Sequence, residues 1–594
     1  MKKIYLSIIP LLLLNSCTLF TPSASSKESV TESVTSEKSE ESSTSITSQS
    51  SEVESTSTSQ SSTKESESTK ESQSSGSSQG SESTSESQSS ESQSSESHSS
   101  EESTSTSESV SSLKKIEIYA SNDFHGAVEE TSDQIGLIKF GTYFKKKGAE
   151  KNTLLIDQGD SWQGSIYSNY NRGRLVNDVM CEARFDARTI GNHDFDWGLA
   201  PLKSNTARSY NGYTIPVLAA NVYDYNFSTK TEGSIQQSDI GVSTVSYTLE
   251  NGLKVGIVGI IGKDQITSIT STIVQDICFR EHISIIKNEA TKLKNSGCNV
   301  VIASAHTPHS NLVENNLENY VDLVLCGHSH DVEQTNEGDL HYAQFGSYGQ
   351  CFGHITLTYD TSINDVVGTN VQQLYPSDIN SELNGYVDTT IKNLVQTSNS
   401  ECQPIADEVV ASNVSGSFYS NSNLPNMMTK AIFDTAVKEG HSDITLAMCN
   451  NARVSLQNKS SWKYSDIYEA FPFDNEIYII EASGKDIVNE LGYSTIFACV
   501  NDTLANQETK TLKRNTKYKI AVIDYLAVHT GSTRYYNYFA SANGVVLDTL
   551  TNPYRTILKN WLNEKGYSTG TQLSYYSFTT NTNNCFKKDI TAVS

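Results

Sequence analysis

The feature that most constrains this sequence is a recurrence. Five short strand-like runs each end within a few residues of a side chain that can bind a metal ion, and they cover residues 115–120, 153–156, 187–190, 299–303 and 321–325. Alternating or continuously apolar runs of this length are typical of strands in a buried sheet. In α/β sheets ligands collect outside the carboxyl ends of the strands, where the loops converge. We therefore expect an α/β fold with one site built from five loops, and helices such as 283–295 as crossover connections.

The side chains that follow these runs donate oxygen and nitrogen. They are Asp123, His125, Asp160, Asn192, His306, His328 and His330. Two carboxylates, one amide and four imidazoles suit Zn, Mn, Co or Fe and suit a soft, thiolate-binding metal poorly. Seven ligands are too many for one ion, but with one shared carboxylate they match two ions roughly 3.5–4 Å apart. The sequence therefore predicts a centre of two divalent metal ions.

Three of these ligands directly follow a glycine, at Gly159, Gly191 and Gly327. Because glycine tolerates backbone conformations that other residues avoid, we expect these glycines to let the chain turn sharply from strand to site. His309, three residues after His306, is expected to lie outside the ligand set, since both ions are already supplied.

At this point the order of motifs resembles a known family. Asp123-x-His125, Gly159-Asp160, Gly191-Asn192-His193-Asp194 and Gly327-His328-x-His330 look like the calcineurin-like metallophosphoesterases. The segment 192–198, Asn-His-Asp-Phe-Asp-Trp-Gly, is similar to the 5′-nucleotidase and UDP-sugar hydrolase branch. The resemblance implies an N-terminal four-layered αββα sandwich, joined by a helix to a C-terminal α/β substrate-binding domain.

The resemblance also implies a role for each site residue. Asp123, His125 and His330 would bind one ion, and Asn192, His306 and His328 the other. Asp160 would bridge the two ions. His193 would face the substrate phosphate as a catalytic residue, oriented by Asp196.

The implied chemistry follows from these residue types. Two cations would neutralise the phosphoryl oxygens and generate a hydroxide near neutral pH, which would attack phosphorus in line with the leaving oxygen. A protonated His193 would add positive charge where the equatorial oxygens gain negative charge. Asp196 would raise the pKa of His193 and fix its tautomer. We therefore expect a metal-dependent phosphoric ester hydrolase.

We expect the metal domain to span residues 113–375, a connecting helix 376–399, and the second domain 400–594. The helical spacing runs from 381 to 396. In the second domain we expect a helix at 427–437 and strands at 444–448, 476–481 and 518–523.

The second domain resembles the C-terminal domain of the 5′-nucleotidase branch. By that resemblance Phe473 and Tyr525 would stack on a nucleobase, a contact worth about 1–3 kcal/mol per base, and Arg453 would bind phosphate. The alternatives are core packing for the two aromatic side chains and a surface charge for Arg453.

The second domain also departs from the family pattern. The family's Gly-Gly-Asp after the second aromatic residue is replaced at 528–531 by Val-His-Thr-Gly, which provides no carboxylate for the ribose. The turn at 448–453 lacks the family's glycine, and 417–421 lacks the upstream arginine. The first domain thus favours hydrolysis strongly, whereas the second favours a nucleotide only weakly.

Two N-terminal segments precede the fold. Residues 1–16 have a charged start and an apolar core too short to span a bilayer, as a signal peptide does, and the following Cys17 resembles a lipobox cysteine. Residues 17–112 consist mainly of Ser, Glu and Thr and bury too little apolar surface to fold, so we expect a disordered tether. We therefore expect a lipid-anchored protein on the extracytoplasmic face of a bacterial membrane, with the tether reaching through a cell wall as a further hypothesis.

Composition excludes some partners. The formal net charge of −25 argues against nucleic acid or an anionic membrane surface as an electrostatic partner. The ten cysteines form no CxxC pair, so neither a zinc ribbon nor a dense disulfide framework is expected. We expect a monomer whose only membrane contact is the lipid anchor.

Three functions compete. The first is hydrolysis of nucleotide phosphate esters. The second keeps the metal chemistry but changes the substrate to a cyclic nucleotide, a nucleotide-sugar pyrophosphate or another phosphoester. The third is a non-catalytic surface binding or adhesion lipoprotein, which the complete ligand set disfavours because buried carboxylates and imidazoles without ions are costly.

Overall fold

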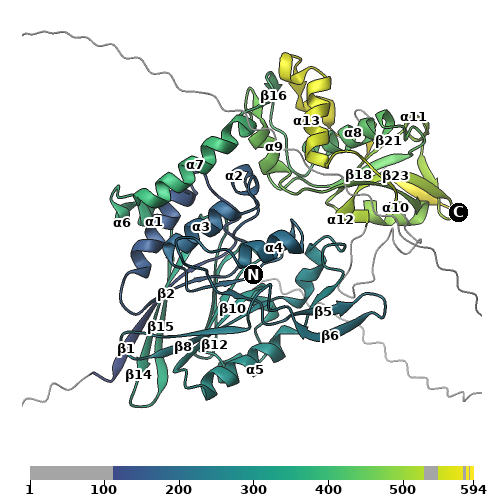
Figure 1. The fold of residues 1–594 in the computed structure, drawn as a ribbon. Helices are drawn as coiled ribbons and strands as arrows, with labels where there is room; N and C mark the ends of the chain where they lie inside the picture. The colour runs from purple at the N-terminus through teal and green to yellow at the C-terminus, as the bar shows by residue number, and fades with distance from the viewer. Residues whose placement is uncertain (1–110, 528–545, 580–583, 587–588) are drawn as a thin grey trace, which may run out of the picture. The chain divides into compact units, whose positions relative to one another are not determined.

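The computed structural model describes residues 111–527, 546–579, 584–586 and 589–594 (Figure 1). The predicted signal, Cys17 and the predicted tether as far as residue 110 lie outside the described residues, as does the segment 528–531. Among the helices of the described ranges, none combines the length and apolarity needed to cross a membrane.

Residues 113–374, here called the N-terminal module, contain two six-stranded sheets. The first has the strand order β15-β14-β1-β2-β3-β4, in which β1 to β4 are parallel, β14 is antiparallel to β1, and the edge strand β15 is antiparallel to β14. Its strands are β1 (Leu113–Ser121), β2 (Thr153–Asp157), β3 (Ala187–Thr189), β4 (Val217–Leu218), β14 (Phe352–Asp360) and β15 (Asp365–Leu374).

The second sheet has the order β12-β13-β11-β10-β8-β7. Its four inner strands are parallel, and β7 and β12 are antiparallel edge strands. Its strands are β7 (Thr244–Thr248), β8 (Lys254–Ile261), β10 (Val300–His306), β11 (Leu323–Cys326), β12 (Val332–Glu337) and β13 (Leu340–Phe345). A smaller sheet, β6-β5-β9, consists of β5 (Val222–Asn226), β6 (Thr231–Gln236) and β9 (Ile277–Phe279).

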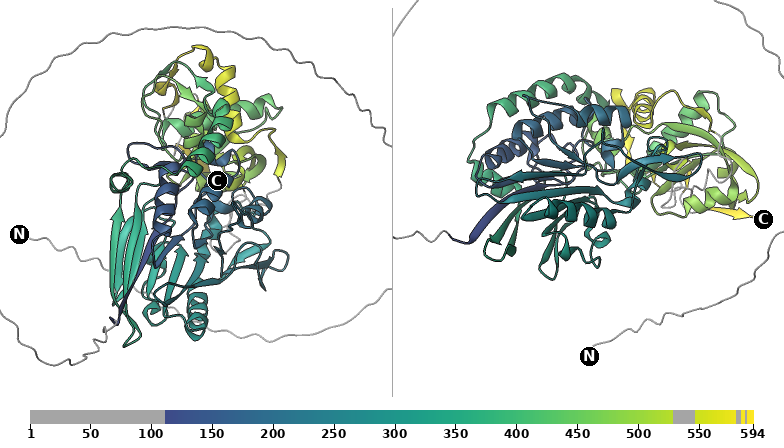
Figure 2. Two further views of the ribbon diagram at one scale, coloured as in Figure 1. Left: turned by 60° about the vertical axis from the view of Figure 1, so that its left-hand side comes forward. Right: turned by 60° about the horizontal axis from the view of Figure 1, so that its bottom comes forward.

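The two large sheets pack face to face. Ile116 and Ile118 of β1 share one buried cluster with Ile257 of β8, whereas Tyr119, which points the opposite way along the strand, belongs to the cluster on the other face. Helices α1 (Gly136–Gly148) and α3 (Arg174–Ala183) cover that outer face, and α5 (His282–Asn295) covers the outer face of the second sheet (Figure 2). The predicted αββα layering is confirmed.

Helix α5 shows how the local sequence specifies such a layer. Ile286, Ala290 and Leu293 recur at helical spacing and are buried against the sheet. Glu281 caps the helix, accepting hydrogen bonds from the backbone N–H groups of Ile283 and Ser284. The shorter helices of this module are α2 (Ile166–Asn169), α4 (Leu199–Thr206), and the 3₁₀ turns η1 (His193–Phe195), η2 (Lys263–Ser268), η3 (His309–Asn311) and η4 (Leu317–Asn319).

The connection between the modules differs from the single helix expected over 381–396. It consists of α6 (Pro376–Leu383) and α7 (Thr389–Ala406). The chain turns at Asn384 and Gly385, whose φ angles of 45° and 80° are left-handed and end the first helix. Helix α7 contacts α1, α2 and α3.

Residues 409–594, here called the C-terminal module, contain a sheet of order β24-β20-β23-β18-β21-β26. Its strands are β18 (Leu446–Asn450), β20 (Ile477–Ser483), β21 (Ile496–Val500), β23 (Lys517–Ile523), β24 (Val546–Thr549) and β26 (Cys585–Phe586). A disulfide between Cys499 and Cys585, which the sequence did not reveal, joins β21 to β26. The other seven cysteines of the described residues are buried free thiols.

Helices cover both faces of this sheet (Figure 1). The helices are α8 (Asn423–Lys438), α9 (Tyr464–Ala470), α10 (Gly484–Leu491), α11 (Asp502–Ala505), α12 (Asp524–Ala527) and α13 (Tyr554–Glu564), with the 3₁₀ turns η6 (Tyr567–Thr569) and η7 (Tyr575–Phe578). Three strand pairs complete the module: β16 (Val409–Ala411) with β19 (Trp462–Lys463), β17 (Val414–Ser415) with β25 (Leu573–Ser574), and β22 (Lys510–Lys513) with β27 (Ile590–Val593). The helix expected at 427–437 lies within α8, and the three expected strands correspond to β18, β20 and β23, each displaced by one or two residues at an end.

Candidate metal centre and adjoining cleft

The predicted ligands lie at the carboxyl ends of five strands, in both large sheets. They follow β1, β2, β3 and β11, except that His306 is the last residue of β10. Two groups form, in each of which one donor atom per residue lies within 4.8 Å of the others: Asp123, His125 and His330, and Asp160, His306 and His328. The structure therefore brings together residues separated by more than 200 positions in the chain.

Asn192 joins the second group. Its Oδ1 lies 2.8 Å from Nδ1 of His328 and 3.1 Å from Nε2 of His306. The loops of the two groups are hydrogen-bonded to each other, because the backbone N–H of His125 donates to the carbonyl oxygen of Asp160 at 2.9 Å. The two groups are therefore neighbours in one site.

The ligand backbone is strained. Five of the ligand residues have left-handed φ angles between 48° and 79°, which residues other than glycine rarely adopt. They are Asp123, His125, Asp160, His328 and His330. Such conformations cost of order 1–3 kcal/mol each and persist only where the surrounding structure enforces them. Of the three glycines, Gly159 has the expected positive φ, at 96°. For Gly191 we expected glycine because the backbone would need an unusual conformation, and this is wrong. A Cβ at this position would lie 2.1 Å from Oδ1 of Asp160, so glycine is needed because there is no room for a side chain.

The imidazoles are held in defined orientations. Nδ1 of His306 donates to the carbonyl oxygen of Gln158 at 2.8 Å, and Nδ1 of His125 donates to that of Gln163 at 3.0 Å. These bonds place the lone pair of each imidazole on Nε2, which faces the site.

The carboxylates fit a cation. Oδ1 of Asp123 and Oδ2 of Asp160 are buried and accept no hydrogen bond from the described residues. Burial raises the pKa of Asp123 to about 7, and the neighbouring Asp160 adds to the rise although His306 opposes it. A buried carboxylate is costly unless positive charge compensates it, so the donor set present here fits divalent cations.

His193 lies beside this centre in η1. Its Nδ1 is 2.9 Å from Oδ2 of Asp196, and its backbone N–H donates to Oδ1 of Asp160 at 2.8 Å. Burial lowers the pKa of His193, but the carboxylates of Asp196 and Asp160 outweigh burial and the net shift is upward. The imidazole is thus held in one orientation and favoured in its protonated form.

A buried charge network, which sequence reasoning missed, lies beneath the ligand loops. Nη2 of Arg188 is 2.5 Å from Oδ1 of Asp194, its Nε is 3.5 Å from Oδ1 of Asp157, and all three side chains are fully buried. The guanidinium stacks on Trp162 at 3.7 Å. Asp194 accepts the N–H of Gly191, and Asp157 accepts that of Gly159. In the sequence, the one signal that could have indicated this network was Arg188, a charged residue inside the strand-like run 187–190.

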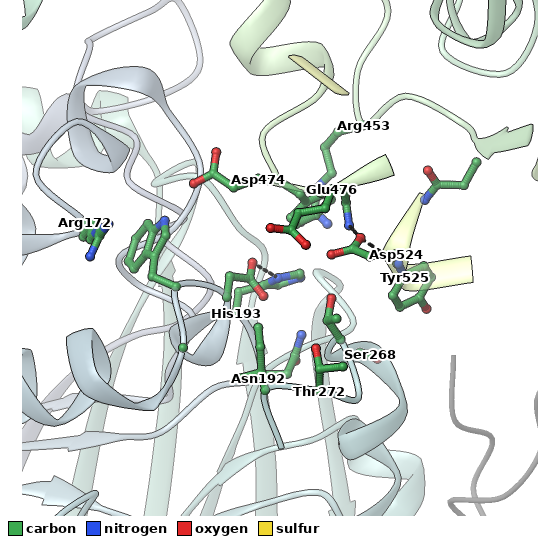
Figure 3. A pocket seen from close by; sticks show the side chains of 18 of the residues that line it. Arg172, Asn192, His193, Ser268, Thr272, Arg453, Asp474, Glu476, Asp524 and Tyr525 are labelled. Atoms are coloured by element: carbon green, nitrogen blue, oxygen red, sulfur yellow. Dashed lines mark hydrogen bonds and ion pairs between the residues drawn. The ribbon is translucent and has the colours of Figure 1, made fainter. Parts of the chain in front are cut away.

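A cleft of about 630 Å³ opens beside the centre (Figure 3). Its walls come from both modules and include Asn192, His193 and His328 as well as the predicted substrate residues Arg453, Phe473 and Tyr525. The ring of Phe473 stacks on that of His193, with 5.2 Å between centroids and 22° between planes. Phe473 and Tyr525 are only partly buried, so neither is a plain core residue.

Arg453 extends from the C-terminal module to the metal centre. Its Nε donates to the hydroxyl of Tyr348 at 2.7 Å, and its Nη2 lies 3.2 Å from Nε2 of His125. Nearby, Nε2 of Gln163 donates to the carbonyl oxygen of Pro472 at 3.0 Å, which fixes the loop before Phe473 against the N-terminal module. Arg453 is therefore no isolated surface charge.

A second cavity, of about 500 Å³, adjoins the same centre. His125 and Arg453 line it together with Gln163, Tyr348 and Pro472. Arg453 thus borders both cavities, and no motif in the sequence had indicated Tyr348 or the second cavity.

Comparison with known proteins agrees with this geometry. The model of the calcineurin-like phosphoesterase family matches residues 116–332, and that of the 5′-nucleotidase C-terminal domain matches residues 403–499. The snake venom 5′-nucleotidase of Crotalus adamanteus is 26% identical over 426 residues, covering 64% of this chain and 70% of its own length. The cell wall protein Lmo0130 of Listeria monocytogenes is 23% identical over 520 residues, covering 69% of this chain and 63% of its own length.

The fold has solved counterparts. The 5′-nucleotidase precursor of Thermus thermophilus superposes with a TM-score of 0.64 at 18% identity, over 81% of this chain and 100% of that one. Several other curated relatives are matched over less than half of their own length.

Proposed function

We propose that this chain, which belongs to the calcineurin-like phosphoesterase family and carries a 5′-nucleotidase C-terminal domain, hydrolyses phosphate esters of nucleotides outside the cytoplasm. Its family and its two groups of metal-binding side chains both identify it as a metal-dependent phosphoester hydrolase. The observation that carries the substrate proposal is the cleft, which opens beside the metal centre and is lined by Phe473 and Tyr525.

In this proposal Asp123, His125 and His330 hold one divalent ion, and Asn192, His306 and His328 hold the other. Asp160 would be shared by the two ions. The hydrogen bond from the backbone N–H of His125 to the carbonyl oxygen of Asp160 supports this, because it places the two groups of ligands side by side. Bound there, the ions would stabilise charge on the phosphoryl oxygens and activate the attacking water.

The chain's own side chains position the phosphate. His193, held by Asp196, offers an imidazole whose protonated form the neighbouring carboxylates favour by raising its pKa, and Arg453 offers a guanidinium from the opposite module. Both place positive charge where the transferred phosphoryl group gains negative charge, which is the main way proteins accelerate this reaction.

Phe473 and Tyr525 hold the nucleoside. Both are partly exposed aromatic rings on the cleft wall, and each base offers a π-face to such a ring. Since Phe473 already stacks on His193, the base contact and the phosphate contact are coupled through one pair of rings.

The extracytoplasmic location is part of the proposal. The disulfide between Cys499 and Cys585 supports it, because disulfides persist mainly in oxidising compartments. The lipobox-like Cys17 supports anchoring by lipid, and mass spectrometry of the mature N-terminal peptide from cells tests it.

The substrate is tested by phosphate release from the full chain supplied with Zn, Mn or Co. The panel is AMP, ATP, UDP-glucose, a cyclic nucleotide and an aryl phosphate. We expect AMP to exceed the aryl phosphate in kcat/KM by about five- to a hundredfold, since each stacked base contributes about 1–3 kcal/mol. Equal kcat/KM values would refute the nucleotide preference.

The second cavity favours one alternative substrate class. Because it is lined by His125 and Arg453 but not by Tyr525, it offers room for a second organic group on the phosphorus, as in a phosphodiester or a nucleotide-sugar pyrophosphate. Preference for UDP-glucose or a diester over AMP in the same panel would favour this alternative.

A further inference from the structure

Arg555 is a buried arginine that no sequence motif had indicated. It is the second residue of α13, and only 4% of it is exposed. It lies outside residues 116–332 and 403–499, the ranges that the two family models match. Arginine stays charged even when it is buried, so its guanidinium needs anions, carbonyl oxygens or aromatic faces around it. The groups that surround Arg555 therefore show what it stabilises.

The partners of Arg555 lie in α9 and in the loop 471–476 that follows it. Its Nη1 donates to the carbonyl oxygen of Phe471 at 2.8 Å and to that of Phe473 at 2.6 Å. Its Nη2 forms an ion pair with Oδ1 of Asp474. The Cζ of the guanidinium lies 3.5 Å from the ring centroid of Tyr468 in α9. One side chain thus holds the backbone of the loop at two points and anchors it to α13.

The same loop is held from the N-terminal module. The carbonyl oxygen of Pro472 accepts hydrogen bonds from Nε2 of Gln163 at 3.0 Å and from Nδ2 of Asn169 at 3.2 Å. Three consecutive carbonyl oxygens, at positions 471, 472 and 473, therefore accept hydrogen bonds from side chains. Buried backbone polar groups need such partners, and a polar network that is fully satisfied makes a segment rigid.

This rigid loop carries Phe473 to the cleft. Phe473 lines the cleft, and its ring stacks on that of His193 with 5.2 Å between centroids. An aromatic side chain has only two torsion angles, so the position of its ring depends mainly on the backbone that carries it. Stacking needs a defined distance and angle between the two rings. A loop that is ordered before the substrate arrives also lowers the entropic cost of binding.

We propose that Arg555 is a positioning residue for substrate selection. It holds Phe473 at the cleft wall before the substrate arrives, and it thereby supports the preference for phosphoesters that carry a nucleobase. This proposal rests on the proposed nucleotide substrate and deepens it. Arg555 does not line the cleft, so it acts through the loop 471–476.

The test compares two substrates of the full chain, AMP and ribose 5-phosphate, which has the same phosphate and sugar but no base. Arg555→Met keeps the apolar bulk of the side chain and removes its donors. It should lower kcat/KM for AMP by about five- to a hundredfold, the factor that one stacked base is worth, mainly through a higher KM. The kcat/KM for ribose 5-phosphate should change by less than about twofold, since this substrate has no base to lose.

A second variant guards against misfolding. Asp474→Asn leaves Arg555 with its carbonyl partners and with a neutral acceptor, and the side chain that it changes is 48% exposed. It should lower the ratio of the two kcat/KM values by about two- to tenfold, because a neutral hydrogen bond holds the loop less firmly than a charged one. Loss of activity on both substrates in Arg555→Met marks a folding defect, and Asp474→Asn then decides alone.

Two comparisons separate positioning from a general structural role. In a Phe473→Ala background, Arg555→Met and Asp474→Asn should leave the ratio unchanged, because the ring that they position is absent. Lys559→Met, one turn further along α13, is the control and should keep the wild-type ratio. It removes an equivalent ion pair, from Nζ of Lys559 to Oε2 of Glu408 at 2.7 Å, in a part of α13 that does not line the cleft.

The proposal is overturned by a ratio that keeps its wild-type value in both variants, or by one that falls equally far in the Phe473→Ala background. Equal loss on both substrates in Asp474→Asn overturns it as well. If wild type hydrolyses AMP and ribose 5-phosphate equally well, the proposed nucleotide function fails and this proposal fails with it. A wild-type preference for AMP that both variants retain leaves that function intact and refutes only the role of Arg555.

Discussion

Replacing Arg188 by Met should destabilise the N-terminal module strongly. The guanidinium is fully buried between Asp194 at 2.5 Å and Asp157 at 3.5 Å, and Met keeps its apolar bulk while removing the charge. Removing one partner of a buried ion pair costs about 3–5 kcal/mol, because the other charge remains uncompensated. We therefore expect the free energy of unfolding of Arg188→Met to fall by at least about 3 kcal/mol at pH 8.

The pH dependence has a definite sign. Burial raises the pKa of Asp194 to about 6 even with Arg188 beside it. Removing the cation raises this folded-state pKa further, so the variant loses most stability above pH 6, where wild type keeps the carboxylate ionised. At pH 5 the group is already largely protonated in the folded protein, and the difference between variant and wild type should shrink.

The assay is urea denaturation of the full chain in the presence of a chelator, at pH 5 and pH 8, so that metal binding contributes nothing to stability. The double variant Arg188→Met/Asp194→Asn should recover part of the loss, which a double-mutant cycle measures. A loss below about 1 kcal/mol at pH 8, or one equally large at pH 5, refutes the reasoning.

Three further predictions concern the site and one buried acid. His193→Ala should lower kcat about 10²- to 10⁴-fold while the metal content, measured by plasma mass spectrometry, stays unchanged; loss of metal would contradict the assigned role. Asp160→Asn should reduce the content of both metals, and retention of two ions per chain would show that the carboxylate is not shared. Glu490→Gln should stabilise the protein at pH 8 and have little effect at pH 4. Burial raises the pKa of Glu490 from 4.5 to about 7, so wild type loses stability as pH rises through that window; urea midpoints that differ equally at both pH values would contradict this.

Much of the fold was predictable from periodicity. The strands beginning at Lys115 and Thr153 and the helix 283–295 have patterns that depend only on near neighbours, and all three appear in the structure. The connecting helix was predicted as one element because helical spacing was weighed above a local stop signal: Asn384 and Gly385, both left-handed, end α6 inside the pattern. The disulfide, by contrast, was inaccessible from the sequence, since Cys499 and Cys585 are 86 residues apart and meet only through strand pairing.

The sequence by itself determined which side chains can bind metal, because the ligand types and their positions after strand-like runs are local facts. Only the tertiary structure decided what surrounds them. Arg453 contacts Tyr348 across 105 positions, and Asn475 orients Asp524 across 49. The first contact depends on how the two modules pack, and the second on the pairing of β20 with β23 inside the C-terminal module. Both are properties of assembled surfaces that no local pattern encodes.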